Sequence, residues 1–153
     1  FVNMLQAIPE DVQIVAHSFG CLTSVAALAQ HPELNAKVKN LLLVAPANPA
    51  RFGENGFALD SQTDYSAYFQ QLKLQVPTKL LISENDPWLS FEDAHLLAQA
   101  WKIKPVNLGA VGHVNVASGF GPFPEIEQYL ISENAMPYIS KVDDSKYYFK
   151  FAF

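Results

Sequence analysis

The sequence contains a single cysteine among its 153 residues. One cysteine cannot form a disulfide within the chain, and it is compatible with a reducing compartment. The apolar runs all fall short of the roughly 18 residues that a membrane-spanning helix needs, and no signal peptide is recognisable. We therefore expect a cytoplasmic protein that does not use a membrane as a partner.

Positive charge is also scarce. The chain has 10 Lys and Arg residues against 15 Asp and Glu residues, which gives a net charge of −5, and it has no basic run. Proteins bind nucleic acids and anionic membrane surfaces through patches of basic residues, so we expect neither of them as a partner. Hydrophobic residues make up 50% of the chain and charged residues 16%, which fits one globular domain with a sizeable core.

Short apolar runs alternate along the chain with segments of helical periodicity. The runs predict strands at residues 12–16, 40–45, 78–83 and 106–108. The periodic segments predict helices at 21–30, 65–74, 91–101 and 125–132, after the end of another helix within 1–10, and residues 46–57 read as a loop. This alternation favours an α/β fold, a parallel sheet with helices on both faces. We assign residues 1–130 to this core and leave the tail 131–153 unassigned, although its aromatic end at 147–153 could be a strand.

One serine lies where the first predicted strand meets the next predicted helix. The stretch Ala16-His17-Ser18-Phe19-Gly20 is close to the Gly-x-Ser-x-Gly nucleophile elbow, with alanine at the first glycine position. The elbow needs small residues on either side of the serine because strand and helix pack closely there. The backbone N–H of Phe19 would then point toward an oxyanion. A serine between small residues is also common at ordinary strand-to-helix turns, so this alternative stays open.

An acid and a histidine follow the later strands. In doubly wound α/β proteins, functional groups collect at the carboxyl ends of the strands. Asp86 follows the third predicted strand and His113 follows the fourth. The order serine, acid, histidine is the one expected of an α/β-hydrolase. In such a triad Ser18 would attack a carbonyl, His113 would take its proton, and Asp86 would orient the imidazole.

The acid has rivals. Asp86 precedes a proline and could simply form a turn, and Glu84 lies only two residues before it. Three further aspartates follow no predicted strand directly: Asp60, Asp64 and Asp93.

The remaining histidines and the cysteine have simpler interpretations. His31 caps a helix end and His95 lies within a predicted helix, whereas His113 stands in a glycine-flanked loop. The side chain of His17 should point away from the serine hydroxyl and line or pack the elbow. Cys21 reads as a small core residue at a helix start.

Three stretches together resemble a known family. They are the elbow at 16–20, the acid loop Ser-Glu-Asn-Asp-Pro-Trp at 83–88, and Gly-His-Val-Asn-Val-Ala-Ser-Gly-Phe-Gly at 112–121 followed by the Pro-Glu pair at 124–125. The chain resembles, from Val12 to Tyr129, the small serine hydrolases related to retinoblastoma-binding protein 9, within the α/β-hydrolase superfamily.

The resemblance implies a compact α/β-hydrolase without a large cap, which uses Ser18, Asp86 and His113 on small acyl esters. No cofactor and no metal are expected, and the partner would be a small acyl substrate. Trp88, Phe19 and the 48–57 loop would enclose that substrate. Two other functions stay open: a binding or regulatory module on a hydrolase scaffold, and acyl transfer or thioester hydrolysis by the same triad.

The sequence departs from the family at its start. Members begin with a further strand and a glycine-containing loop that supplies a second oxyanion donor, whereas here one predicted helix precedes the elbow strand. We expect an N-terminally truncated hydrolase that is a poor catalyst. Its exposed sheet edge would favour self-association unless residues 147–153 cover that edge.

Overall fold

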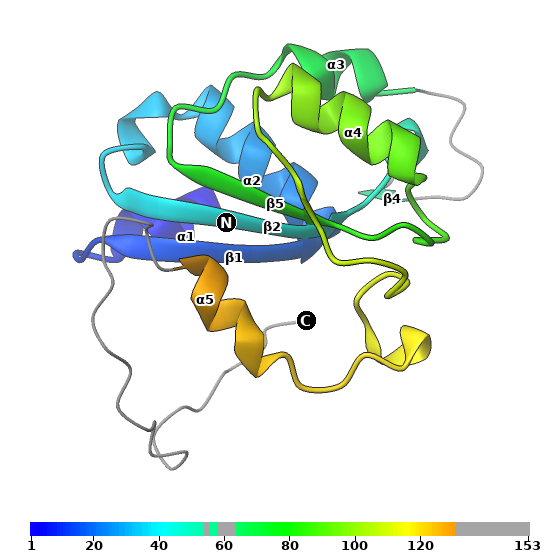
Figure 1. Cartoon of the computed structure of the whole chain (residues 1–153). Coiled ribbons are helices and arrows are strands. Elements are labelled where there is room, and N and C mark those ends of the chain that lie inside the picture. Colours follow the sequence, from blue (N-terminus) through cyan, green and yellow to red (C-terminus); the bar gives the residue numbers. More distant parts are fainter. Residues whose placement is uncertain (54–55, 58–63, 131–153) are drawn as a thin grey trace.

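A four-stranded parallel sheet forms the centre of the protein. The computed structural model describes residues 1–53, 56–57 and 64–130. The strands are β1 (Val12–Ser18), β2 (Val38–Pro46), β5 (Thr78–Ile82) and β6 (Val106–Asn107). They lie in the order β1-β2-β5-β6, and each neighbouring pair is parallel. Figure 1 labels β1, β2 and β5.

Helices lie on both faces of this sheet, as the sequence predicts. One face carries α2 (Phe19–Gln30), α3 (Ser66–Gln71) and α4 (Phe91–Ala100), and the other carries α5 (Glu127–Leu130) (Figure 1). The first helix, α1 (Val2–Ala7), ends before Pro9 and leads into β1. The α/β fold class is therefore confirmed.

The central strand β2 explains why the core has two sides. Leu41 and Leu43 pack into the cluster beneath α2, whereas Leu42 and Val44 pack into the cluster beneath α5. A strand buried on both faces is apolar throughout, which is why the run at 40–45 was recognisable. Leu43 is completely buried, and burying a leucine side chain contributes about 1.5 to 3 kcal/mol to stability.

Several short elements differ from the predictions. Within the predicted 46–57 loop, β3 (Phe52–Gly53) pairs antiparallel with β4 (Gly56–Phe57). Helix α3 is shorter than predicted because the backbone is already extended at Leu72. Four 3₁₀ turns complete the described elements: η1 (Pro32–Leu34), η2 (Pro49–Arg51), η3 (Val116–Ser118) and η4 (Pro124–Ile126).

Strand β1 lies at one edge of the sheet. Among the residues that the structure describes, β1 pairs with β2 alone. Self-association through this edge stays a prediction, and the strand predicted at 147–153 lies outside the described residues. Every helix in the described part of the chain is too short or too polar to cross a membrane.

Candidate active site

Ser18 occupies a strained turn between β1 and α2. It is the last residue of β1 and the N-cap of α2, with φ 55° and ψ −122°. A non-glycine residue in such a conformation is costly and is typical of functional sites. A Cβ built on Gly20 would lie 3.9 Å from the Cβ of Ala16, which is ordinary contact, so the packing between these two residues does not by itself require a glycine.

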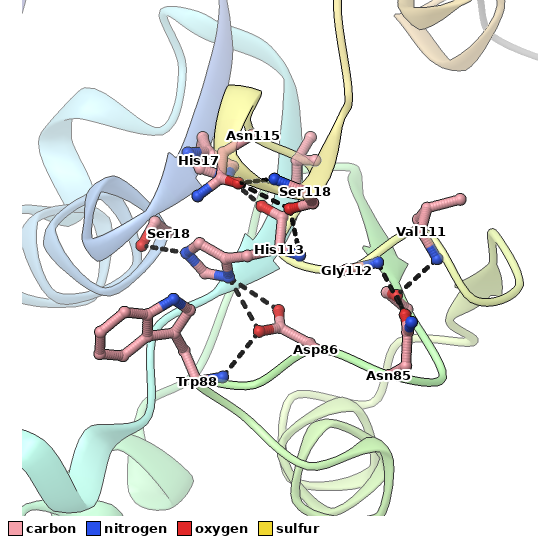
Figure 2. Close-up of polar contacts among 12 residues, drawn as sticks. His17, Ser18, Asn85, Asp86, Trp88, Val111, Gly112, His113, Asn115 and Ser118 are labelled. Atoms are coloured by element: carbon pink, nitrogen blue, oxygen red, sulfur yellow. Dashed lines mark hydrogen bonds and ion pairs between the residues drawn. The ribbon is translucent and has the colours of Figure 1, made fainter.

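The structure brings Ser18, His113 and Asp86 together (Figure 2). The Ser18 hydroxyl lies 2.7 Å from His113 Nε2, and His113 Nδ1 lies 2.8 Å from Asp86 Oδ2 and 3.0 Å from Oδ1. The histidine and aspartate side chains are only 7% and 4% exposed. Because the carboxylate accepts the proton on Nδ1, Nε2 is left to accept the serine proton.

The acid in contact with His113 is Asp86, not Glu84. Asp86 Oδ1 also accepts the backbone N–H of Trp88 at 2.9 Å, which fixes the carboxylate. Glu84 is exposed, and its Oε1 accepts from Asn107 Nδ2 at 2.8 Å. Of the other rivals, Asp64 accepts from a backbone N–H at 2.8 Å, Asp93 bonds the N-cap of α4 at 2.7 Å, and Asp60 lies outside the described residues.

The other candidate side chains take part in local structure. His31 Nδ1 lies 3.1 Å from Glu33 Oε1 at the end of α2. His95 packs edge-on against Phe91 within α4. Cys21 is completely buried, and burial raises the pKa of its thiol to about 12, so it is no nucleophile at neutral pH.

Side chains of the acid loop hold the backbone of the histidine loop. Ser83 Oγ accepts the N–H of Val111 at 3.1 Å, and Asn85 Oδ1 accepts the N–H of Gly112 at 2.7 Å. Sequence analysis did not identify these two contacts. Ser83 and Asn85 lie within three residues of Asp86 in the acid loop. This closeness in sequence is the only signal that could have identified them as residues that support the site.

His113 itself is bonded on both sides of its backbone. Its N–H is donated to Ser118 Oγ at 3.0 Å, and its carbonyl accepts from His17 Nε2 at 2.8 Å. Asn115 Oδ1 accepts from the Ser118 hydroxyl at 2.6 Å and from the Ser118 N–H at 2.9 Å. The motif residues Asn115 and Ser118 therefore order the loop that carries His113.

Gly112 is a position where a side chain cannot be accommodated. A Cβ at Gly112 (φ 65°) would lie 2.5 Å from the Cβ of Ser118. We expect Gly112→Ala to lower both kcat and the thermal midpoint, because the clash displaces the loop in addition to the backbone strain of roughly 1 to 2 kcal/mol.

The matched control is Gly119→Ala. Gly119 has a similar φ of 75°, but an added Cβ would meet no described atom within 4 Å. Its variant therefore reports backbone strain alone. Equal losses of kcat and thermal midpoint in the two variants would contradict the role given to the Gly112–Ser118 contact.

An aromatic side chain and an arginine lie next to the triad. The ring centroids of Trp88 and His113 are 6.3 Å apart, and Figure 2 shows the indole beside the contact between Ser18 and His113. Arg51 Cζ lies 4.8 Å from the centroid of the Trp88 ring. Trp88 is 40% exposed, so part of its surface is accessible to a ligand. Among the described residues, no cluster of His, Cys, Asp or Glu side chains could hold a metal ion.

Solved structures of several hydrolases are similar to this chain. A YdeN-like hydrolase from Pectobacterium atrosepticum is 34% identical, with a TM-score of 0.64, over 84% of this chain and 62% of that chain. An esterase from Rhodococcus sp. (11% identity, TM-score 0.55, 84% of this chain and 68% of that one) shares the fold. So does an alpha/beta superfamily hydrolase from Oenococcus oeni (15% identity, TM-score 0.50, 79% of this chain and 66% of that one).

The sequence comparisons show the family of the chain but no narrower group. The chain spans less than two thirds of the length of the Pectobacterium hydrolase. No curated protein sequence matches it, and the narrower resemblance to relatives of retinoblastoma-binding protein 9 stays a prediction. The family model described as serine hydrolase matches residues 1–132. The chain belongs to the serine hydrolase family.

Proposed function

We propose that this protein hydrolyses small acyl esters through an acyl-enzyme formed on Ser18. The observation that carries the proposal is the pair of hydrogen bonds made by one imidazole, 2.7 Å to the Ser18 hydroxyl and 2.8 Å to Asp86. A nucleophile bonded to a base, which is in turn oriented by a buried acid, is the arrangement that activates serine.

In the acylation step Ser18 Oγ attacks the ester carbonyl carbon while its proton passes to His113 Nε2. The Asp86 carboxylate, held on the other ring nitrogen, stabilises the imidazolium that forms. The negative charge develops on the former carbonyl oxygen. We assign the backbone N–H of Phe19, at the first residue of α2, as one donor to this oxyanion, with the positive end of the helix dipole behind it.

Collapse of the tetrahedral species breaks the ester bond. The alcohol leaves with the proton that His113 Nε2 returns, and the acyl group stays on Ser18. A water molecule then attacks the acyl carbonyl, gives its proton to the same Nε2, and releases the carboxylic acid as the serine is regenerated. Each step needs the imidazole in one tautomer, which the bond to Asp86 fixes.

Trp88 is our candidate for substrate binding. Its indole is partly exposed beside His113, and its backbone N–H, not its side chain, bonds Asp86. We expect Trp88→Ala to raise KM for an aryl ester about tenfold, equivalent to about 1.4 kcal/mol, while kcat changes less. Leu96→Ala, on an exposed leucine of α4, is the control. An unchanged KM in Trp88→Ala would remove Trp88 from the binding site.

The reaction class is tested by steady-state and burst kinetics. A series of p-nitrophenyl esters, from acetyl to octanoyl, is compared with a thioester and an anilide of the same acyl group. The proposal predicts turnover of the short esters and a burst of p-nitrophenol equal to the enzyme concentration when deacylation is slow. A faster reaction with the thioester would change the substrate class, and no turnover across the series would leave the binding-module alternative.

A further inference from the structure

The residue directly before Ser18 in the chain makes a contact with the histidine loop that the mechanism above does not use. His17 Nε2 lies 2.8 Å from the backbone carbonyl oxygen of His113, and the two rings lie 4.9 Å apart at 53°. We propose that His17 is a positioning residue: its Nε2–H holds the main chain of His113 and so keeps the base within reach of the Ser18 hydroxyl. The inference rests on the proposed function of the triad.

The fold explains why such a link is needed. Ser18 ends β1, whereas His113 follows β6, and two other strands lie between these in the sheet. No strand pairing therefore fixes their separation directly. The bond from His17 spans the carboxyl edge of the sheet between the two segments (Figure 2). His17 and Ser18 are consecutive in the chain. A bond from His17 that holds the His113 carbonyl therefore also holds the His113 imidazole in place relative to the Ser18 hydroxyl.

The backbone directly after His113 is strained. Val114 has φ 50°, and a left-handed conformation is a genuine outlier for a β-branched residue such as valine. The other side-chain bond to the His113 backbone comes from Ser118, which belongs to the same loop and moves with it. Besides the triad contact between the His113 ring and Ser18, the bond from His17 ties the backbone of His113 to the nucleophile strand β1.

The protonation state of His17 suits this role. Desolvation lowers the pKa of His17, against the opposing effect of its bond to the His113 carbonyl. Two neighbouring titratable side chains also act on the pKa of His17: His113 lowers it and Asp86 raises it. A neutral ring with the proton on Nε2 still donates the bond. It places no positive charge against the imidazolium that forms on His113 during catalysis.

Two substitutions separate donation from mere packing. His17→Leu fills similar space without a donor, and His17→Gln keeps an N–H donor at a similar reach. We expect His17→Leu to lower kcat roughly 10- to 100-fold with little change in KM, because a displacement of about 1 Å costs up to 10²-fold. His17→Gln should retain kcat within about threefold of wild type. His31→Leu, far from the triad on the end of α2, is the matched control, and thermal midpoints confirm that each variant is folded.

A second readout needs no substrate. The His113 Nδ1 proton, bonded to Asp86, is expected to give a strongly downfield NMR resonance that persists in His17→Gln and shifts or broadens in His17→Leu. An unchanged kcat and resonance in His17→Leu, or an equal loss in the leucine and glutamine variants, would overturn the inference. Absence of turnover in the wild type would count against the proposed function alone, since the resonance would still decide the role of His17.

Discussion

Replacing Ser18 with alanine is expected to lower kcat for a small aryl ester by about 10⁵- to 10⁶-fold, the loss typical of a serine nucleophile. The reason is that the Ser18 hydroxyl is the nucleophile in contact with His113 Nε2 in the part of the chain that the structure describes. The fold should persist because alanine only removes a hydroxyl. Circular dichroism and the thermal midpoint check this, and p-nitrophenyl acetate hydrolysis measures the loss.

The matched control is Cys21→Ala. Cys21 carries the hydroxyl or thiol group nearest to Ser18 in the sequence, but it is completely buried and the pKa of its thiol is raised. We expect this variant to keep wild-type kcat if it remains folded. Turnover by Ser18→Ala within about tenfold of wild type would show that another residue is the nucleophile.

The second large effect concerns the acid. Asp86→Asn should lower kcat by about 10³- to 10⁴-fold, because an amide stabilises the wrong imidazole tautomer and cannot balance the imidazolium. Glu84→Gln is the matched control, since the Glu84 carboxylate bonds Asn107 and not His113. A harmless Asp86→Asn together with a damaging Glu84→Gln would show that the acid is misassigned.

His113→Ala extends the same test. We expect it to cost about as much as loss of the serine, since the members of a triad act as a unit. For the same reason the double variant Ser18→Ala, His113→Ala should be no worse than either single variant. Additive losses would mean that the two residues work independently.

The parts of the fold that were predicted are those with a strong local signal. The run at 40–45 lies within β2, whose residues from Leu41 to Ala45 are buried on both faces of the sheet and are all apolar. The elbow was recognisable because the serine stands between small residues at a change from strand to helix. The placement of Asp86 and His113 followed from the rule that parallel strands end at one edge.

The parts that were missed depend on contacts between distant segments. The bond from His17 to the His113 carbonyl joins residues 96 positions apart. A side-chain bond to a backbone group leaves no periodicity or composition signal in either segment. The interpretation of His17 as lining or packing the elbow therefore missed its partner, since His17 is exposed and its Nε2 bonds the His113 carbonyl. The pairing of β3 with β4 was missed because each strand has only two residues.

The central claim is that Ser18 is activated by His113 and Asp86. Fluorophosphonate probes phosphonylate an activated serine, so treatment of the native protein followed by mass spectrometry locates the nucleophile directly. The account predicts one adduct per chain on the peptide that carries Ser18. It also predicts no adduct in Ser18→Ala and strongly slowed labelling in His113→Ala. Labelling of a different residue in the native protein, or labelling of Ser18 that is equally fast without His113, would contradict it.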